Sequence, residues 1–202
     1  MKRLFLLLSV LFFTLTAEGA SNSSFVKNWG LHKSVVQECL RLGVDPRVVV
    51  AIRWIESYKL NGTVYPYAVR VNSGLSKLKD LEFSGVKRVS KHVFVCSSRN
   101  SCVEFVKKLI SLGVVNFDAG LYQINYLHNG DKFRNYPEDV FDRIESGKFV
   151  CRYVAEKLKK YGFHANAVAF YHSFQKERNE KYAEKFYSVY DKLVFSGVKR
   201  GN

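Results

Sequence analysis

The sequence predicts a mainly helical α+β domain, with a small β-hairpin region inserted at about residues 64–96. Apolar residues recur at helical spacing through most of the chain. Residues 64–96 are instead rich in valine, tyrosine and phenylalanine, and Gly74 and Gly85 interrupt them, which is typical of short strands and turns. Roughly 182 residues follow a predicted export signal, a length that fits one domain with a sizeable core. We therefore expect a single domain.

The first twenty residues have the layout of a secretory signal peptide. Two basic residues precede an apolar run at residues 4–15, and Gly19 and Ala20 supply a small-residue cleavage site. This run is shorter than the roughly 20 residues that a membrane-spanning helix needs. We therefore expect residues 1–20 to be removed and residues 21–202 to form one periplasmic or otherwise exported domain, without stable membrane insertion.

The chain is strongly basic, with a formal net charge of +14 at pH 7. A basic surface suits nucleic acid, anionic lipid and the carboxylate-bearing peptides of a cell wall, so charge alone does not select a partner. The sequence contains no nucleic-acid-binding motif. Export and the missing motif together favour the cell wall or a membrane surface over nucleic acid.

Four cysteines in an exported chain predict two disulfides. Three pairings are possible, and we favour Cys96–Cys102, which would close the polar turn between them, with Cys39–Cys151 joining two helices. The cysteine and histidine spacing does not match a zinc site. We therefore expect neither a metal nor a cofactor.

Helices are expected from capping residues and apolar periodicity. The first covers residues 33–42, and the second covers 46–58 after the N-cap candidate Asp45. Ser101 and Glu104 form a predicted capping box for the third. The third and later helices are expected at 102–112, 137–144, 147–161, 165–172 and 176–194.

One hexapeptide occurs twice in the chain. Residues 83–88 and residues 195–200 both read Phe-Ser-Gly-Val-Lys-Arg. Two short copies this far apart do not define a repeat period, so we interpret the match as coincidence.

Glu56 places a carboxyl group on the apolar face of the second helix. Val49, Ile52 and Glu56 follow one another at i, i+3 and i+7, so they share that face. Apolar neighbours and the negative end of the helix dipole favour a protonated carboxyl, the form that a general acid needs, whereas Arg53 opposes them. Glu56 is therefore our candidate catalytic residue, although it also fits a plain surface ion pair with Arg53.

Four segments, in order, resemble the motifs of the lytic transglycosylases of glycoside hydrolase family 23. Residues 50–57 (VAIRWIES) resemble the helix that ends in the catalytic Glu-Ser pair, and residues 65–72 (YPYAVRVN) resemble the segment after it. Residues 117–125 (FDAGLYQIN) are similar to the Asp-x-Gly-Leu-Met-Gln-Ile-Asn block, and residues 167–173 (AVAFYHS) to the aromatic C-terminal motif. The long gap between the first and third motifs points to the specialised group that serves type IV secretion and conjugation.

The resemblance implies a lysozyme-like fold and a peptidoglycan-cleaving enzyme that uses no cofactor. It implies that Glu56 protonates the glycosidic oxygen between MurNAc and GlcNAc and then takes a proton from the C6 hydroxyl of the same MurNAc, giving 1,6-anhydro-MurNAc. The implied partners are peptidoglycan glycan strands and components of a secretion apparatus. The substrate-binding residues expected from these motifs are Ser57, Tyr67, Asp118, Gly120, Tyr122, Gln123, Asn125 and Tyr171.

Each of these residues has an expected role in binding a sugar, and for several of them a purely structural role is the alternative. Gln123 and Asn125 offer amide hydrogen bonds to N-acetyl or hydroxyl groups, or else cap a turn. Tyr67 and Tyr122 are expected to stack on sugar rings, or else to belong to the core. Gly120 is expected to let a glycan approach the backbone. Tyr171 is expected beside Glu56.

The sequence departs from the family pattern at three positions. Tyr122 replaces a methionine, His172 an asparagine and Phe174 a glycine, changes that reshape the sugar groove without touching the acid. Two other functions stay open. Asp118 as a second carboxylate would make the protein a hydrolytic lysozyme, a muramidase, and a domain that grips peptidoglycan without cutting it would be a binding module.

Overall fold

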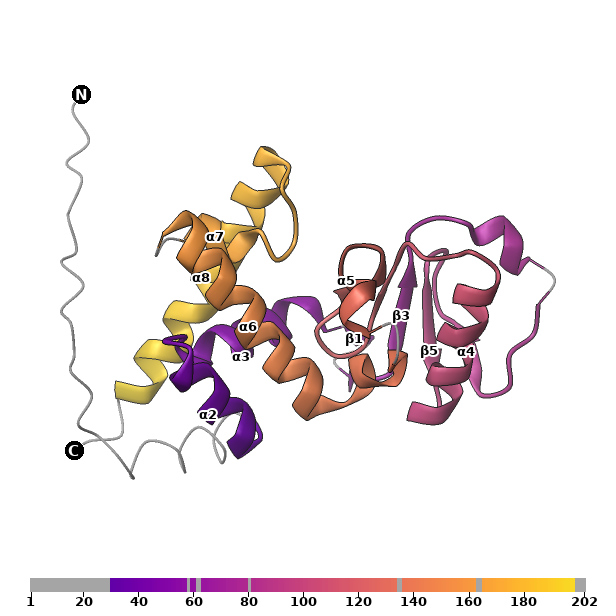
Figure 1. Ribbon diagram of the computed structural model, residues 1–202, viewed down its shortest axis with the longest axis horizontal. Coiled ribbons are helices and arrows are strands. Elements are labelled where there is room, and N and C mark those ends of the chain that lie inside the picture. Colours follow the sequence, from indigo (N-terminus) through magenta and orange to yellow (C-terminus); the bar gives the residue numbers. More distant parts are fainter. Residues whose placement is uncertain are drawn as a thin grey trace.

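The computed structural model describes residues 30–57, 59–60, 63–79, 81–133, 136–162 and 165–198. The predicted signal segment lies outside these residues. Figure 1 shows a helical part on one side of the molecule and a sheet part on the other. Among the described residues, no helix combines the length and apolar character needed to cross a membrane. The expected fold class, mainly helical α+β, is confirmed at this level.

The helical part surrounds one central helix, α3 (Pro46–Glu56). Val49 and Ile52 on α3 are fully buried, as expected for its apolar face. The helices that pack around it or next to it are α2 (Lys33–Arg41), α6 (Arg143–Tyr161), α7 (Ala165–Ala169) and α8 (Lys176–Val198).

Asp45 fixes the beginning of α3. Its carboxylate accepts a hydrogen bond from the Arg47 backbone N–H (2.9 Å), which confirms the predicted N-cap. The Tyr190 hydroxyl of α8 donates to the same carboxylate (2.7 Å). Because Tyr190 belongs to another helix, this cap also ties α3 to α8.

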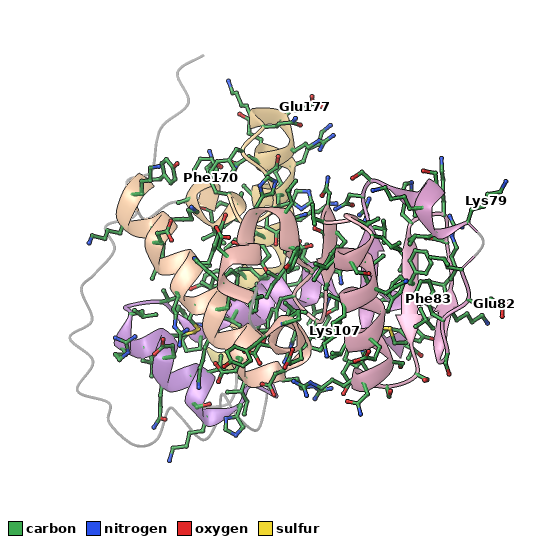
Figure 2. The ribbon with its side chains drawn as sticks, turned by 45° about the vertical axis from the view of Figure 1, so that its right-hand side comes forward. Lys79, Glu82, Phe83, Lys107, Phe170 and Glu177 are labelled. Atoms are coloured by element: carbon green, nitrogen blue, oxygen red, sulfur yellow. A yellow bond between two sulfur atoms is a disulfide. The ribbon has the colours of Figure 1, made fainter. Side chains whose placement is uncertain are left out.

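The sheet part holds a five-stranded antiparallel sheet in the order β4-β5-β3-β6-β7. Apolar residues on one face of it pack on helix α4 (Arg99–Ser111), where Phe94 and Phe83 both contact Phe105. Phe83 is labelled in Figure 2. The opposite face carries polar residues, including Arg70 and Asp118, which face each other across β3 and β6. The strands are β3 (Ala68–Val71), β4 (Val86–Arg88), β5 (Val93–Cys96), β6 (Phe117–Ala119) and β7 (Ile124–Asn125).

Short elements connect the two parts. A two-stranded hairpin of β1 (Lys59–Leu60) and β2 (Thr63–Val64) follows α3. The 3-10 helix η1 (Leu75–Leu78) follows β3. Helix α5 (Tyr126–Phe133) and the 3-10 helix η2 (Pro137–Phe141) lead from the sheet to α6. Phe117 stacks on Tyr126 and Phe133 contacts Phe149 (both 5.0 Å), so one core continues from the sheet into the helices.

Both predicted disulfides are confirmed. Cys39–Cys151 joins α2 to α6, and Cys96–Cys102 joins the end of β5 to α4. The Cys39–Cys151 disulfide is accompanied by an ion pair between the same two helices, in which Arg152 on α6 contacts Glu38 on α2 (2.7 Å).

Several predicted boundaries need correction. The capping box of the third helix is formed by Ser98 and Ser101, and Glu104 instead pairs with Lys107 on the exposed side of α4. The helix expected at 137–144 is a 3-10 helix, because Asp142 ends it and caps α6. The remaining differences are in the helix bounds: the 33–42 helix ends at Arg41, the 46–58 helix ends at Glu56, the 102–112 helix covers Arg99–Ser111, the 147–161 helix begins at Arg143, the 165–172 helix ends at Ala169 and the 176–194 helix runs to Val198.

The sheet is larger than the sequence predicted. The region 64–96 holds β3, β4 and β5, but β6 and β7 lie beyond it and α5 was not expected. The two copies of the hexapeptide also differ in structure. The first is a turn followed by β4, whereas residues 195–198 of the second continue α8, which supports coincidence.

Candidate active site

Glu56 is the last residue of α3, and Ser57 fastens that end of the helix. The Ser57 backbone N–H and hydroxyl both donate to the Arg53 carbonyl. The same hydroxyl also contacts the carbonyl of Leu121 (3.2 Å), in the turn between β6 and β7. Ser57 is itself buried. Ser57 therefore fixes Glu56 against this turn, and its expected contact with substrate stays a prediction.

The Glu56 side chain is only 14% exposed, and its Oε1 atom is buried without a hydrogen-bond partner. The Nδ1 atom of His172 lies 3.7 Å from Oε1. The Tyr182 hydroxyl is also buried, and its pKa is raised well above the usual value by burial, then by the charge of Glu56, and by its hydrogen-bonding approach to the same carboxyl. Glu56, His172 and Tyr182 therefore form one cluster where α3, the turn after α7, and α8 meet.

Arg53 does not dominate this environment. Its guanidinium donates to the backbone carbonyl of Gly30 (3.1 Å), and its pKa is lowered mainly by burial. The structure therefore gives no support to a plain Glu56–Arg53 surface pair as the reason for Glu56, whose carboxyl group is largely withdrawn from solvent.

Tyr171 lies within electrostatic reach of Glu56, on the segment where the sequence placed it. Its hydroxyl donates to the carbonyl of Tyr122 (2.7 Å), and its ring packs edge-on against Tyr153 (5.6 Å). Burial raises its pKa well above the usual value, and the charges of Glu56 and, more weakly, Asp118 raise it further. The negative charges of Glu56 and Asp118 therefore both raise the pKa of the Tyr171 hydroxyl.

Asp118 is held by asparagine side chains on the open face of the sheet. Asn72 donates to one carboxylate oxygen (2.9 Å) and Asn125 to the other (2.7 Å). Asn116 accepts weaker contacts from both amides (3.4 and 3.3 Å). Asn125 also accepts a hydrogen bond from the His128 backbone N–H, which fixes its orientation. The expected pair Asp118 and Asn125 is thus brought together within one network.

Asn72 and Asn116 are members of this site that the sequence did not predict. Asn72 stands at the end of one motif, and Asn116 lies just outside another. Their alternation with buried residues on β3 and β6 was the available signal, because alternate residues share one face of a sheet. Seeing it required knowledge that the two strands are neighbours.

Gly120 and Tyr122 pack against other parts of the fold. A Cβ atom on Gly120 would lie 2.1 Å from the Val140 carbonyl oxygen, so η2 packs closely against this glycine. Tyr122 is only 1% exposed, and its hydroxyl lies against Gly147 of α6. The geometry fits the core interpretation of Tyr122, and the expected contacts of both residues with substrate stay predictions.

Gln123 closes the turn that begins at Gly120. Its side-chain amide donates to the Gly120 carbonyl (2.7 Å) and more weakly to the Ala68 carbonyl (3.4 Å). It adopts φ +47°, an uncommon conformation for a residue with a side chain. The turn-capping role that the sequence left open is therefore the one that the geometry shows. Tyr67, also expected at the groove, is half-buried against the core just before β3.

Other features of the described residues lie away from Glu56. Two shallow hollows do not include it, one between α2 and α6 at Leu42 and Arg152, and one beside β4 at Tyr65 and Lys87. Among the described residues, no group of three or more histidine, cysteine, aspartate or glutamate side chains is arranged to hold a metal ion.

No protein-family model, curated protein or solved structure matches this chain. The geometry of the site is therefore the indication of its chemistry. It places two carboxyl groups in contrasting settings, one largely buried and without a partner on Oε1, the other held by two amides on an open face. The two carboxyl groups therefore differ in solvent exposure and in hydrogen bonding.

Proposed function

We propose that this protein is a peptidoglycan lytic transglycosylase with a lysozyme-like fold, in which Glu56 is the single catalytic acid and base. The observation that carries the proposal is the Glu56 carboxyl at the end of a buried helix, with Oε1 buried and lacking a hydrogen-bond partner. A carboxyl in this setting is suited to hold a proton and deliver it to an enclosed oxygen atom of a substrate.

The convergence of the four motif segments supports the proposal. They are far apart in the sequence, yet all of them meet at the turn of residues 120–123. The Ser57 hydroxyl contacts one carbonyl of this turn (3.2 Å), and the Tyr171 hydroxyl donates to the next (2.7 Å). The first residue of β3 accepts a hydrogen bond from the start of the turn (2.9 Å). The contacts that position Glu56 therefore come from the segments in which the resemblance lies.

In the proposed reaction, Glu56 donates its proton to the β-1,4 glycosidic oxygen between MurNAc and GlcNAc as that bond breaks. The resulting carboxylate takes the proton of the MurNAc C6 hydroxyl, whose oxygen bonds to C1. The products are a strand ending in 1,6-anhydro-MurNAc and a free GlcNAc end, and Glu56 regains the proton it gave. Asp118 carries a negative charge that would favour the positive charge developing on the sugar ring.

The proposed biological role is local opening of the cell wall for a secretion or other envelope-spanning apparatus. The resemblance to the specialised transglycosylases supports this role. The high net positive charge is compatible with a substrate whose stem peptides carry carboxylates, and the two disulfides are compatible with export.

A hydrolytic muramidase is the second candidate, and the Asp118 network favours it. A retaining glycosidase needs a second carboxylate as nucleophile or stabiliser, with water completing the reaction. Asp118 is fixed by Asn72 and Asn125, and its charge adds to that of Glu56 on Tyr171, which supports this second candidate. Its product would be a reducing MurNAc end.

Mass spectrometry of the sugars released from purified peptidoglycan tests both candidates. The expected result for the predicted mature protein is 1,6-anhydro-MurNAc ends, lost at least about 100-fold in Glu56→Gln because the acid is removed. Glu104→Gln is the matched control, since Glu104 is exposed on α4 and paired with Lys107. It should cleave as wild type does.

The other outcomes assign the remaining functions. Reducing ends that disappear in Asp118→Asn as well as in Glu56→Gln would establish the muramidase. Sedimentation of folded wild-type protein with the wall, without any released sugar, would contradict both enzymes and establish a binding module.

A further inference from the structure

His172 is the residue whose position next to Glu56 the proposed reaction does not use. Its Nδ1 atom lies 3.7 Å from Glu56 Oε1, and its side chain is 46% exposed. We propose that His172 and Glu56 share one proton, with His172 as the positioning residue that keeps this proton available to the catalytic acid. The proposal rests on the proposed function and deepens it.

The imidazole ring of His172 is held in place from two sides. It stacks flat on the ring of Tyr182, with centroids 4.9 Å apart and an interplanar angle of 8°. Tyr182 is itself buried within α8. The His172 backbone N–H donates to the Ala169 carbonyl (3.0 Å), which fixes the turn that carries the ring. This orientation keeps Nδ1 next to Glu56.

Glu56 Oε1 lacks a hydrogen bond of normal geometry, and the His172 ring and the Tyr182 hydroxyl are the two neighbouring groups that can supply one. The atom is buried and lacks a hydrogen-bond partner, and an unpaired buried oxygen costs free energy. A shift of less than about 1 Å would bring Nδ1 into hydrogen-bond range, and such contacts often tighten when substrate binds. A neutral imidazole accepts from a protonated carboxyl, and an imidazolium donates to a carboxylate. The pair therefore has a hydrogen bond in either arrangement of a single proton.

The tyrosines around the pair stay neutral near neutral pH. Tyr182 on α8 and Tyr171 on the turn after α7 both have pKa values raised well above normal, mainly by burial. Tyr122, behind Tyr171, has its pKa raised by burial in the same direction. These three tyrosines therefore do not compete with Glu56 and His172 for a proton near neutral pH.

The pair of Glu56 and His172 neither gains nor loses a proton over one reaction cycle. The reaction starts from protonated Glu56 and neutral His172, and Glu56 gives its proton to the leaving oxygen. The carboxylate then takes the C6 hydroxyl proton, so the pair ends with the one proton it had at the start. Between turnovers this proton exchanges between Oε1 and Nδ1. Because two bases hold it, the pair keeps the proton to a higher pH than a lone carboxyl would.

The first test is the pH dependence of kcat/KM for wall digestion. In His172→Asn, which replaces the imidazole by a polar amide that cannot hold the proton, the alkaline limb should move to lower pH by about one unit. KM should change less than about twofold, because His172 is a positioning residue. His128→Asn, at an exposed histidine on α5, is the control and should match wild type. An unchanged alkaline limb in His172→Asn would overturn the proposal.

The second test does not depend on activity. The NMR titration of the His172 ring is compared in the wild type and in Glu56→Gln, after thermal unfolding shows both to be folded. The carboxylate favours the imidazolium, so its removal should shift the midpoint to lower pH by at least about half a unit. Equal midpoints would refute the shared proton even if digestion depends on Glu56. A shifted midpoint without any digestion would keep the pair and reject the proposed function.

Discussion

Gly120 is a residue whose lack of a side chain determines the geometry behind Glu56. Its φ of +76° is strained for any other residue type, and a Cβ atom would lie 2.1 Å from the backbone oxygen of Val140. A backbone atom cannot yield as a flexible side chain does. The turn from Gly120 to Gln123 therefore packs directly on η2, and the carbonyls of this turn receive the hydroxyls of Ser57 and Tyr171.

We predict that Gly120→Ala destabilises the protein by about 3 kcal/mol or more, since it combines left-handed backbone strain with a backbone clash. Gly113→Ala is the matched control. Gly113 also has positive φ (+67°), but a methyl group added there would meet only the flexible end of Lys77, at 3.4 Å. It should cost only about 1 kcal/mol. Urea denaturation measures both, and equal losses would show that the contact with Val140 is unimportant.

Gln123, at the other end of the same turn, differs from Gly120 because it combines a positive φ with a side chain that stabilises the turn. It adopts a left-handed conformation without being glycine, and its side-chain amide returns a hydrogen bond to the Gly120 carbonyl (2.7 Å). The amide therefore offsets part of the backbone strain by satisfying a carbonyl of the turn that it closes.

At the scale of elements, α2 and α6 are joined through Glu38. Hydrogen bonds from Arg41 and then Arg152 lower the pKa of Glu38 to about 2. A carboxyl with a lowered folded-state pKa stabilises the protein above its unfolded-state pKa, near pH 4, and loses this contribution as the pH falls toward the folded-state value. The contribution is limited because both arginines are more than half exposed.

We therefore predict that Glu38→Gln lowers the free energy of unfolding by about 1 kcal/mol at neutral pH. Its difference from wild type should shrink between about pH 4 and pH 2 and vanish below that range. Urea denaturation at a series of pH values measures the effect. The control is again Glu104→Gln, whose ion pair lies within one exposed helix and should change stability little. A difference that stays constant with pH would contradict the role of the Glu38 charge.

The sequence predicted those elements that have strong local signals. Asp45 and Pro46 mark the start of α3, and the apolar stripe of α4 was recognised even though its cap is Ser98. The strands β6 and β7 were missed because two or three residues show no periodicity. Helix α5 was missed because it lacks a recognisable cap and has one buried residue.

The residues of the candidate site likewise divide into those that the local sequence could predict and those that it could not. Glu56 was predictable because a carboxyl on an apolar helix face conflicts with its surroundings, and that conflict is local in the sequence. The direction of a side chain within a turn is not local, so Gly120 and Tyr122 were assigned to the substrate while they face η2 and α6. The approach of His172 to Glu56 arises from tertiary packing and had no signal in either segment.

At the scale of the whole molecule, the candidate site lies where the helical part meets the sheet part (Figure 1). Glu56 ends the central helix of one part, and Asp118 lies on the open face of the other. The relative placement of the two carboxyl groups therefore depends on how firmly the parts are joined. The aromatic contacts from Phe117 to Tyr126 and from Phe133 to Phe149 run through this junction.

The two disulfides constrain the molecule at different scales, which gives a prediction for the whole chain. Cys39–Cys151 spans 112 residues and encloses α3 and the sheet part, whereas Cys96–Cys102 spans only 6. A longer closed loop removes more conformational entropy from the unfolded chain. Replacing Cys39 and Cys151 together by serine should cost about 4 kcal/mol, and the same change at Cys96 and Cys102 about 2 kcal/mol. Denaturant unfolding of both double variants, beside reduced wild type, measures the two costs. A larger loss from the short loop would mean that local anchoring of β5 on α4, and not loop entropy, dominates the stability that the disulfides provide.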